Sequence, residues 1–200
     1  MDRKPGRPRA LTVEQIAQAA LDEGPDSFSM PSVARRLGVA HSGLYRYVAD
    51  RDALLTEAID LALKSIDWPE TGQPWDTTLR ELGESLWDLC ARYPGIDRAS
   101  LAAPLAPATA VRLIETYVSE LHRQGFTVED AAVAVNFTYS VTLTASADMA
   151  RLRKTGHSTV AKAQSALLKA YDAEEAYSAR GWYARKLDIV LAGLAPLRLA

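Results

Sequence analysis

Five aromatic or cationic side chains that donate hydrogen bonds lie within eleven residues near the start of the chain. The segment HSGLYRYVADR, residues 41–51, holds His41, Tyr45, Arg46, Tyr47 and Arg51. Imidazole, phenol and guanidinium groups form hydrogen bonds, and the guanidinium group also carries a permanent positive charge. The chemistry that this segment offers is therefore recognition of a polar or anionic partner.

Two short helices separated by a glycine turn are predicted to carry these side chains. Residues 30–37 have apolar side chains at helical spacing, and Gly38 follows them as a helix stop. A second helix is predicted from about His41 to Val48, with Leu44 and Val48 as its apolar anchors. The pattern is a helix, a tight turn and a helix.

Capping residues define the helices around this unit. Thr12 and Gln15 have the spacing of a capping box, at the start of a helix that closes at Gly24. Ser29 is the expected cap of the helix over residues 30–37, and Asp50 that of the helix after it. The segment DWPETGQP, residues 67–74, is typical of a linker.

The rest of the chain also has helical periodicity and few strand signals. An apolar stripe runs from Leu79 to Tyr93 and stops at Pro94 and Gly95. Further helices are predicted from Pro107 to about Gly125, over residues 128–153, and over about 158–171 and 174–194. We therefore expect an all-α fold.

Composition excludes several classes of protein. The 200 residues are 48% hydrophobic and 24% charged, which is ordinary for a globular chain. No apolar run reaches the roughly 18 residues of a membrane helix, and the basic N-terminus lacks the apolar middle of a signal peptide, so we expect a cytoplasmic location. Cys90 is the single cysteine, which excludes an intrachain disulfide. We expect it to be a packed side chain, with a reactive thiol as the alternative.

Charge is distributed unevenly along the chain. Residues 1–51 hold eight Lys or Arg against six Asp or Glu, a net of +2, and the remainder holds 15 against 19, a net of -4. A basic end on an acidic body favours contact of that end with a polyanion, although ordinary surface charge gives the same count.

Motifs for catalysis are missing from the sequence. There is no G-x-S-x-G, G-x-G-x-x-G, P-loop, H-E-x-x-H or C-x-x-C, and the three histidines are far apart. We therefore expect no catalytic residues, no cofactor and no metal site.

Residues 11–62 resemble the tetracycline-repressor-like (TetR) family of bacterial one-component transcriptional regulators. The segments VARRLGVA, LYRYV and DRDALL carry this resemblance in register. Over residues 75–151 it is looser, and YPGIDRASLAAP and LHRQGFTVEDAA are similar to the ligand-binding core of the branch nearest the tetracycline repressors. The resemblance implies a basic arm (1–10), a helix-turn-helix DNA-binding domain (11–56), a connecting helix and linker (57–74), and a helical ligand-binding and dimerisation domain (75–200).

The second helix of a helix-turn-helix enters the major groove, where its first residues reach base edges and flanking groups contact phosphates. Arginine pairs best with guanine, tyrosine hydroxyls suit phosphate oxygens, and small residues let the backbone approach. The alternatives are that the tyrosines pack in the core and that the histidine is merely solvated. The expected DNA-contacting residues of this helix and its flank are His41, Ser42, Gly43, Tyr45, Arg46, Tyr47 and Arg51.

Two further sets of DNA contacts are predicted. Family members often have small polar or basic residues where this chain has Met30 and Pro31, so Ser29 and Ser32 become the expected phosphate contacts. In the arm RKPGRPR, Arg7 and Arg9 are similar to the core of minor-groove AT-hook segments. The alternative for the arm is a disordered solubilising tail.

The resemblance also implies an apolar pocket between helices and a dimer interface of paired helices. The tetracycline repressors bind a drug and magnesium through histidines and a glutamate, but this chain has Ala99, Ser100, Tyr139 and Ser140 where imidazoles are expected, so we expect no magnesium site. Expected pocket residues are Trp87, Tyr93, Tyr117, Asn136, Phe137, Tyr139, Ser140 and Thr144. Expected dimer-interface residues are Ala131, Val135, Thr138, Thr142, Trp182, Leu187, Val190, Leu191 and Leu194.

These patterns together predict a cytoplasmic, nucleoid-associated bacterial regulator. It is expected to be a homodimeric repressor that binds a near-palindromic double-stranded DNA operator, is released by a small molecule, and does not contact the membrane. An enzyme and a helical adaptor, in which the helix-turn-helix meets a protein instead of DNA, are the alternatives.

Overall fold

The computed structural model describes residues 11–155 and 180–198, and every regular element within these ranges is a helix. The all-α expectation is therefore confirmed for this part of the chain. No helix in these ranges is long and apolar enough to cross a membrane. The elements are α1 (Val13–Glu23), α2 (Met30–Leu37), α3 (His41–Leu44), α4 (Arg51–Lys64), α5 (Trp75–Arg92), α6 (Ile96–Ala102), α7 (Ala108–Arg123), α8 (Val128–Thr155), α11 (Tyr183–Leu194) and the 3-10 helix η2 (Ala195–Leu197).

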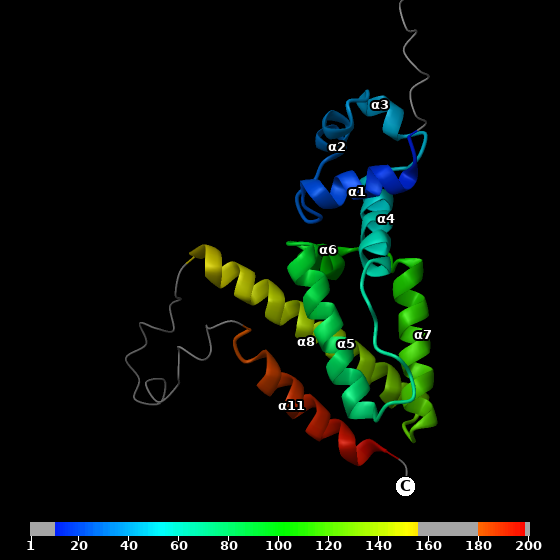
Figure 1. Cartoon of the computed structure of the whole chain (residues 1–200), viewed down its shortest axis with the longest axis vertical. Coiled ribbons are helices and arrows are strands. Elements are labelled where there is room, and N and C mark those ends of the chain that lie inside the picture. Colours follow the sequence, from blue (N-terminus) through cyan, green and yellow to red (C-terminus); the bar gives the residue numbers. More distant parts are fainter. Residues whose placement is uncertain (1–10, 156–179, 199–200) are drawn as a thin grey trace, which may run out of the picture.

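The first three helices form a small head (Figure 1). Both halves of the predicted capping box close on α1, with Thr12 and Gln15 each bonding the other's backbone N–H. The cap of α2 is a second capping box, in which Ser32 supplies the side chain that Glu or Gln usually provides. The head is held by fully buried apolar side chains, among them Ile16, Val33 and Leu44.

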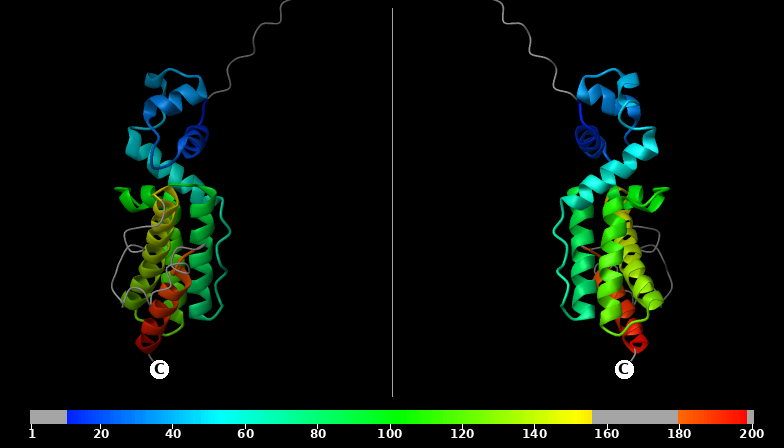
Figure 2. Two further views of the ribbon diagram at one scale, coloured as in Figure 1. Left: turned by 90° about the vertical axis from the view of Figure 1, so that its left-hand side faces the viewer. Right: turned by 90° about the vertical axis from the view of Figure 1, so that its right-hand side faces the viewer.

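Helix α4 joins the head to the body as one continuous helix (Figures 1 and 2). Asp50 caps it by accepting a hydrogen bond from the Ala53 N–H at 2.8 Å. Its first half packs on α1 and its second half reaches α6 and α7. The expected domain boundary between residues 56 and 57 thus falls inside a helix, since Arg51–Lys64 is unbroken.

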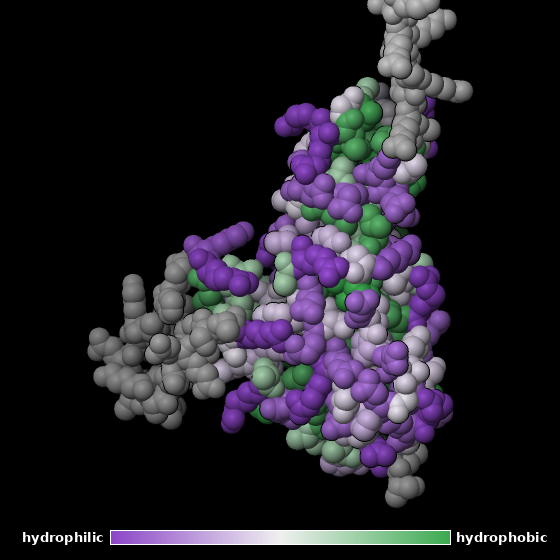
Figure 3. All heavy atoms as spheres, in the orientation of Figure 1, coloured by the Kyte–Doolittle hydropathy of each residue, from purple (hydrophilic) through white to green (hydrophobic). Residues whose placement is uncertain are grey.

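The body is a bundle in which α8 packs against α5, α6, α7 and α11 (Figure 2). The predicted linker runs along the body and is fixed to α7. The Tyr117 hydroxyl donates to the Pro69 carbonyl at 2.9 Å, and the Gly72 N–H donates to the buried Glu120 carboxylate at 3.1 Å. Hydrophilic side chains cover most of the face seen in Figure 3, with separate apolar patches between them.

One predicted helix differs from the structure, and two others lie wholly or partly outside the described residues. The helix expected over residues 41–48 is α-helical only from His41 to Leu44, and a turn follows it. Ala40 offers no side-chain cap, and Gly43 has a low helix propensity, so this segment gains little helical stability of its own. The helix predicted over 158–171 lies outside the described residues, as does the start of the one predicted over 174–194.

Candidate nucleic-acid interface and ligand pocket

A left-handed glycine turn sets the angle between α2 and α3. Gly38 has φ 65 and ψ 30, a conformation that costs a glycine little, and its N–H bonds the last carbonyls of α2. Leu44 and Val48 then anchor the following segment in the core of the head. As a result, α3 lies at the end of the head that is far from the body (Figure 1).

Exposed donors cover the outer side of α3. His41, Ser42, Tyr45 and Arg46 are all exposed, and 49% of Tyr45 is accessible. The rings of His41 and Tyr45 meet edge to face at 5.2 Å, and the Tyr45 hydroxyl lies 3.3 Å from His41 Nε2. Tyr45 is therefore not packed in the core of the head, which was the alternative for this residue.

Tyr47 lies on the inner side of this segment. It is half-buried against the core of the head, so packing is part of its role. The Arg46 guanidinium lies 5.9 Å from the centre of the Tyr47 ring, while Arg46 itself remains exposed. The two tyrosines, two residues apart, thus have different environments.

Arg51 holds the head together, which its sequence position did not predict. Its Nε donates to the Phe28 carbonyl at 3.1 Å, and its guanidinium lies 4.7 Å from the centre of the Phe28 ring. These contacts join the start of α4 to the loop between α1 and α2. Arg51 thus stabilises the head. Any phosphate contact would have to use the part of its guanidinium group that stays exposed.

The two serines expected to contact phosphates are engaged in capping. The Ser29 hydroxyl accepts from the Ser32 N–H at 3.2 Å, and the Ser32 hydroxyl donates to the Ser29 carbonyl at 2.8 Å. Arg7 and Arg9, the predicted minor-groove contacts, lie outside the described residues. The interface that the structure brings together therefore consists of α3 and the turn after it.

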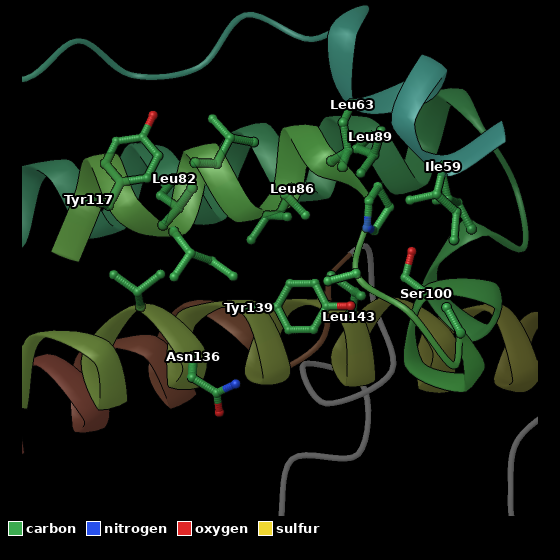
Figure 4. Close-up of a pocket in the computed structure, with 18 of the residues that line it drawn as sticks. Ile59, Leu63, Leu82, Leu86, Leu89, Ser100, Tyr117, Asn136, Tyr139 and Leu143 are labelled. Carbon is green, nitrogen blue, oxygen red and sulfur yellow. The ribbon is translucent and has the colours of Figure 1, made fainter. Parts of the chain in front are cut away.

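A cavity of about 490 Å³ lies in the body beneath the head. Helices α4, α5, α6, α7 and α8 all contribute to its wall, and Figure 4 shows mostly aliphatic side chains pointing into it. None of the described residues that line it carries a formal charge. The Ser100 and Tyr139 hydroxyls lie at one end, whereas the Tyr117 hydroxyl lies toward the other end and bonds the Pro69 carbonyl. Asn136 is exposed and points away.

Burial raises the pKa of the phenol and thiol groups that line this cavity. It raises the pKa of the Tyr139 phenol, although a hydrogen bond with Ser100 acts in the opposite direction. It also raises the pKa of Tyr117 to about 12 and that of the Cys90 thiol to about 12. At neutral pH the cavity is therefore an uncharged, largely apolar site with a hydrogen-bonding end.

Three of the eight predicted pocket residues line this cavity, namely Tyr117, Asn136 and Tyr139. Phe137 and Thr144 are exposed, and Ser140 is not part of the wall, because the wall of α8 is the stripe Val135, Tyr139 and Leu143. These three predictions are therefore corrected.

The other two predicted pocket residues have different partners. The Tyr93 hydroxyl lies 2.9 Å from the Ser65 hydroxyl. Trp87 packs on Tyr183, with ring centres 4.9 Å apart, and lines a second, more polar cavity of about 640 Å³ between head and body. Neither residue faces the apolar cavity.

Aliphatic residues make most of the wall and were not predicted as pocket residues. Leu82, Leu86 and Leu89 of α5 face Leu113 of α7 and Ile59 of α4. The helical stripe of α5 is visible in the sequence, but a stripe that lines a cavity and one that fills a core have the same period. Among the described residues, no group of three or more His, Cys, Asp or Glu side chains could hold a metal ion.

Seven of the nine predicted dimer-interface residues are buried within the chain itself, while Trp182 and Val190 stay predictions. These seven are buried because α11 packs on α8 and both face the body. The large apolar side chains exposed on the described part of these two helices are instead Val128, Val133, Phe137 and Ile189. Trp182 and Val190 are half-buried, and the buried set is Ala131, Val135, Thr138, Thr142, Leu187, Leu191 and Leu194.

Sequence comparison finds regulators that are longer than this chain. No family model matches. An HTH-type transcriptional repressor of Mycobacterium tuberculosis is 32% identical over 131 residues, which are 59% of this chain and 50% of that protein. The HTH-type transcriptional repressor DrrR1 of Streptomyces coeruleorubidus is 26% identical over 141 residues, 66% of this chain and 52% of that protein. The chain thus spans about half the length of the curated relatives it matches.

Solved structures match along nearly the whole chain. The TetR family protein ActR of Streptomyces coelicolor, in complex with actinorhodin, has a TM-score of 0.75 at 24% identity and covers 94% of this chain and 98% of its own. A TetR variant of Acinetobacter baumannii, in complex with minocycline, has a TM-score of 0.79 at 23% identity and covers 96% of both chains. These likenesses establish the architecture of the head and body.

Proposed function

On the premise that this chain has the two-domain fold of the TetR family, as its motifs predicted, we propose that it is a bacterial transcriptional repressor. It binds a near-palindromic DNA operator as a homodimer in the cytoplasm, and a small molecule releases it. The observation that carries this proposal is an uncharged cavity of about 490 Å³ that lies beneath a helix-turn-helix head. The names of the curated relatives support the same function.

The exposed donors of α3 support DNA as the partner of the head. Arg46 is free to point its guanidinium at base edges, where arginine pairs with guanine O6 and N7. The exposed Tyr45 hydroxyl and His41 imidazole suit phosphate or base acceptors at the start of the same helix. A helical adaptor that meets a protein is the alternative, and such an interface needs no phosphate contacts.

The cavity defines the class of the small molecule. Its aliphatic wall favours an apolar ligand, and the absence of charged lining residues disfavours an ion. The Ser100 and Tyr139 hydroxyls could bind one polar group at one end. We propose an uncharged, metal-independent ligand, and a coupling of about 1–3 kcal/mol would change DNA affinity roughly 5- to 150-fold.

Selection on random DNA duplexes tests the proposal directly. We expect the recovered site to consist of two related half-sites about one helical turn apart, because a symmetric dimer presents two copies of α3. Binding should weaken with salt, with a log–log slope of about -0.9 for each phosphate contact. A scrambled duplex of equal length is the control. Recovery of no preferred duplex, together with salt-independent retention on DNA, would instead favour the adaptor.

A further inference from the structure

Helix α6 touches the ligand cavity with one side. Ile96 and Ser100 line the cavity from this short helix. Between them, Asp97 is almost fully buried and accepts a hydrogen bond from the Ser146 hydroxyl of α8 at 2.9 Å. It also accepts one from the Arg98 N–H at 2.8 Å. The start of α6 is therefore fixed to the body by a buried carboxylate.

Arg98, the residue after Asp97 in α6, contacts the head. Arg98 Nε and Nη2 both donate to Asp26 Oδ2, at 2.8 and 2.6 Å, and Asp26 lies in the loop between α1 and α2. Asp26 lies against the backbone of Gly95, where a Cβ would come within 2.2 Å of its Oδ1. Because this fit needs a glycine, the pair is a shaped contact between head and body and differs from a chance surface ion pair.

We propose that Arg98 is a positioning residue that sets the orientation of the DNA-reading head relative to the ligand cavity. A molecule that binds at the Ser100 end displaces α6, and Arg98 passes this displacement to the loop at residues 24–29 through Asp26. The proposal rests on the proposed function, because it assumes that the cavity binds a ligand.

This ion pair is a second connection between body and head, beside the connecting helix α4, on which α6 also packs. Helix α4 is tied to α7 by Asp60, which accepts from the Thr109 N–H at 2.7 Å, and it reaches the head by packing on α1. The Arg98–Asp26 pair bypasses α4 and ends directly before α2, the first helix of the helix-turn-helix. The pair therefore gives the cavity a connection to the loop before α2 that does not run through α4.

Hydrogen exchange on the full chain tests the proposal, with the uncharged apolar dye Nile red as the cavity probe. Dye fluorescence gives its affinity, and the amides of residues 24–29 report on the loop. In the wild type, we expect saturating dye to change their exchange rate about fivefold or more, since allosteric couplings are commonly of this size. Arg98→Ala should bind the dye equally well but lose this change.

Two further variants make the result specific. Asp26→Ala removes the acceptor of both Arg98 bonds and should lose the change as Arg98→Ala does, which guards against misfolding of either variant. Arg80→Ala removes the Arg80–Asp188 ion pair of 2.6 Å, which joins α5 to α11 within the body, and should behave as the wild type.

The possible outcomes separate this inference from the proposed function. If the dye binds and Arg98→Ala keeps the full change at residues 24–29, the Arg98 route is wrong while the cavity remains a ligand site. If Arg80→Ala loses the change as well, the effect is a general loosening and the proposal is overturned. If the wild type does not bind the dye at all, both the apolar ligand site and this inference fail.

Discussion

Two arginines that the sequence presents alike, Arg46 and Arg51, have different environments. Arg46 is exposed beside α3, whereas Arg51 is bonded to the Phe28 carbonyl and stacked on its ring. Arg46→Ala should therefore cost about 1–3 kcal/mol of DNA-binding free energy for a lost bidentate base contact, with an unchanged melting temperature. Arg51→Ala should lower the melting temperature, because a charge-assisted hydrogen bond and a cation–π contact of about 1 kcal/mol in total are lost at a half-exposed site.

Thermal unfolding and operator titration of the same two variants check this prediction. An Arg51→Ala protein that melts as the wild type does, but has a shallower salt slope for DNA binding, would return Arg51 to the set of phosphate contacts.

At the scale of residues, the sequence predicts the side-chain environments that depend on the spacing of neighbouring residues. The exposure of His41 and Tyr45 follows from the apolar anchors Leu44 and Val48. The role of Arg51 could not be predicted, because its acceptor lies 23 residues earlier in the chain. Phe137 has the apolar type of a pocket residue, yet the packing of α8 turns it to the surface, and only the neighbouring helices determine that rotation.

At the scale of elements, α5 and α11 approach closely at Gly83. A Cβ at this position would lie 2.2 Å from the Tyr183 hydroxyl, which is 3.1 Å from the Thr142 hydroxyl of α8. Gly83→Ala should destabilise the fold by about 1–3 kcal/mol through overpacking, even though alanine favours a helix by about 1 kcal/mol. Gly43→Ala, where a Cβ meets nothing within 4 Å, is the matched control and should not destabilise it.

A double-mutant cycle measured by denaturant unfolding identifies the clashing atom. Tyr183→Phe removes the hydroxyl, so the double variant with Gly83→Ala should be more stable than the sum of the single changes predicts. Strict additivity would mean that the space at Gly83 is limited by something other than this hydroxyl.

The start of α7 depends on a carboxylate from α4. Asp60 accepts from the Thr109 N–H at 2.7 Å and pairs with Lys64 at 2.6 Å. Burial alone would raise the pKa of Asp60, but its bonds to Lys64 and Thr109 outweigh burial and lower the pKa below the ordinary value. A lowered folded-state pKa stabilises the protein above about pH 4, the unfolded value, and this contribution is lost as the pH falls through the folded-state pKa.

Asp60→Asn should therefore be less stable than the wild type at neutral pH, and the difference should shrink below about pH 4. Asp60→Ala also removes the cap of α7 and should cost a further 0.5–2 kcal/mol or so at every pH. Urea unfolding between neutral and acidic pH measures both effects. A gap between wild type and Asp60→Asn that stays constant with pH would contradict the shifted pKa.

The helices themselves were mostly predictable, because their ends are marked by local chemistry. Thr12, Ser29 and Asp50 cap helices where the sequence places caps, and Gly38 ends α2 in the expected left-handed turn. The length of α3 was not predictable in this way. Its apolar anchors continue to Val48, but tertiary contacts hold that residue in place without an α-helix around it.

At the scale of the whole molecule, we propose that the exposed apolar side chains of α8 and α11 bind a second copy of the chain. Phe137 is 50% exposed and Ile189 is 64% exposed, on two helices that pack on each other. Apolar side chains that form one continuous exposed patch are typical of an interaction surface. The buried Leu187 and Leu191, which the sequence singled out, instead hold α11 to its own chain.

Charged substitutions on the two kinds of position should therefore have opposite effects. Phe137→Asp combined with Ile189→Asp should leave the chain folded but convert a dimer into a 21.8 kDa monomer, because burying two unpaired carboxylates in an interface is costly. Leu187→Asp should unfold the body. Val111→Asp, at a 42% exposed position on α7, is the control and should remain dimeric. Sedimentation at micromolar concentration, with circular dichroism for folding, separates these cases.

Because each half-site of a palindrome needs one copy of α3, the folded monomer should also lose its preference for the full operator over a single half-site. A wild type that sediments at 21.8 kDa, or a folded double variant that stays dimeric, would show that these faces of α8 and α11 do not join two copies.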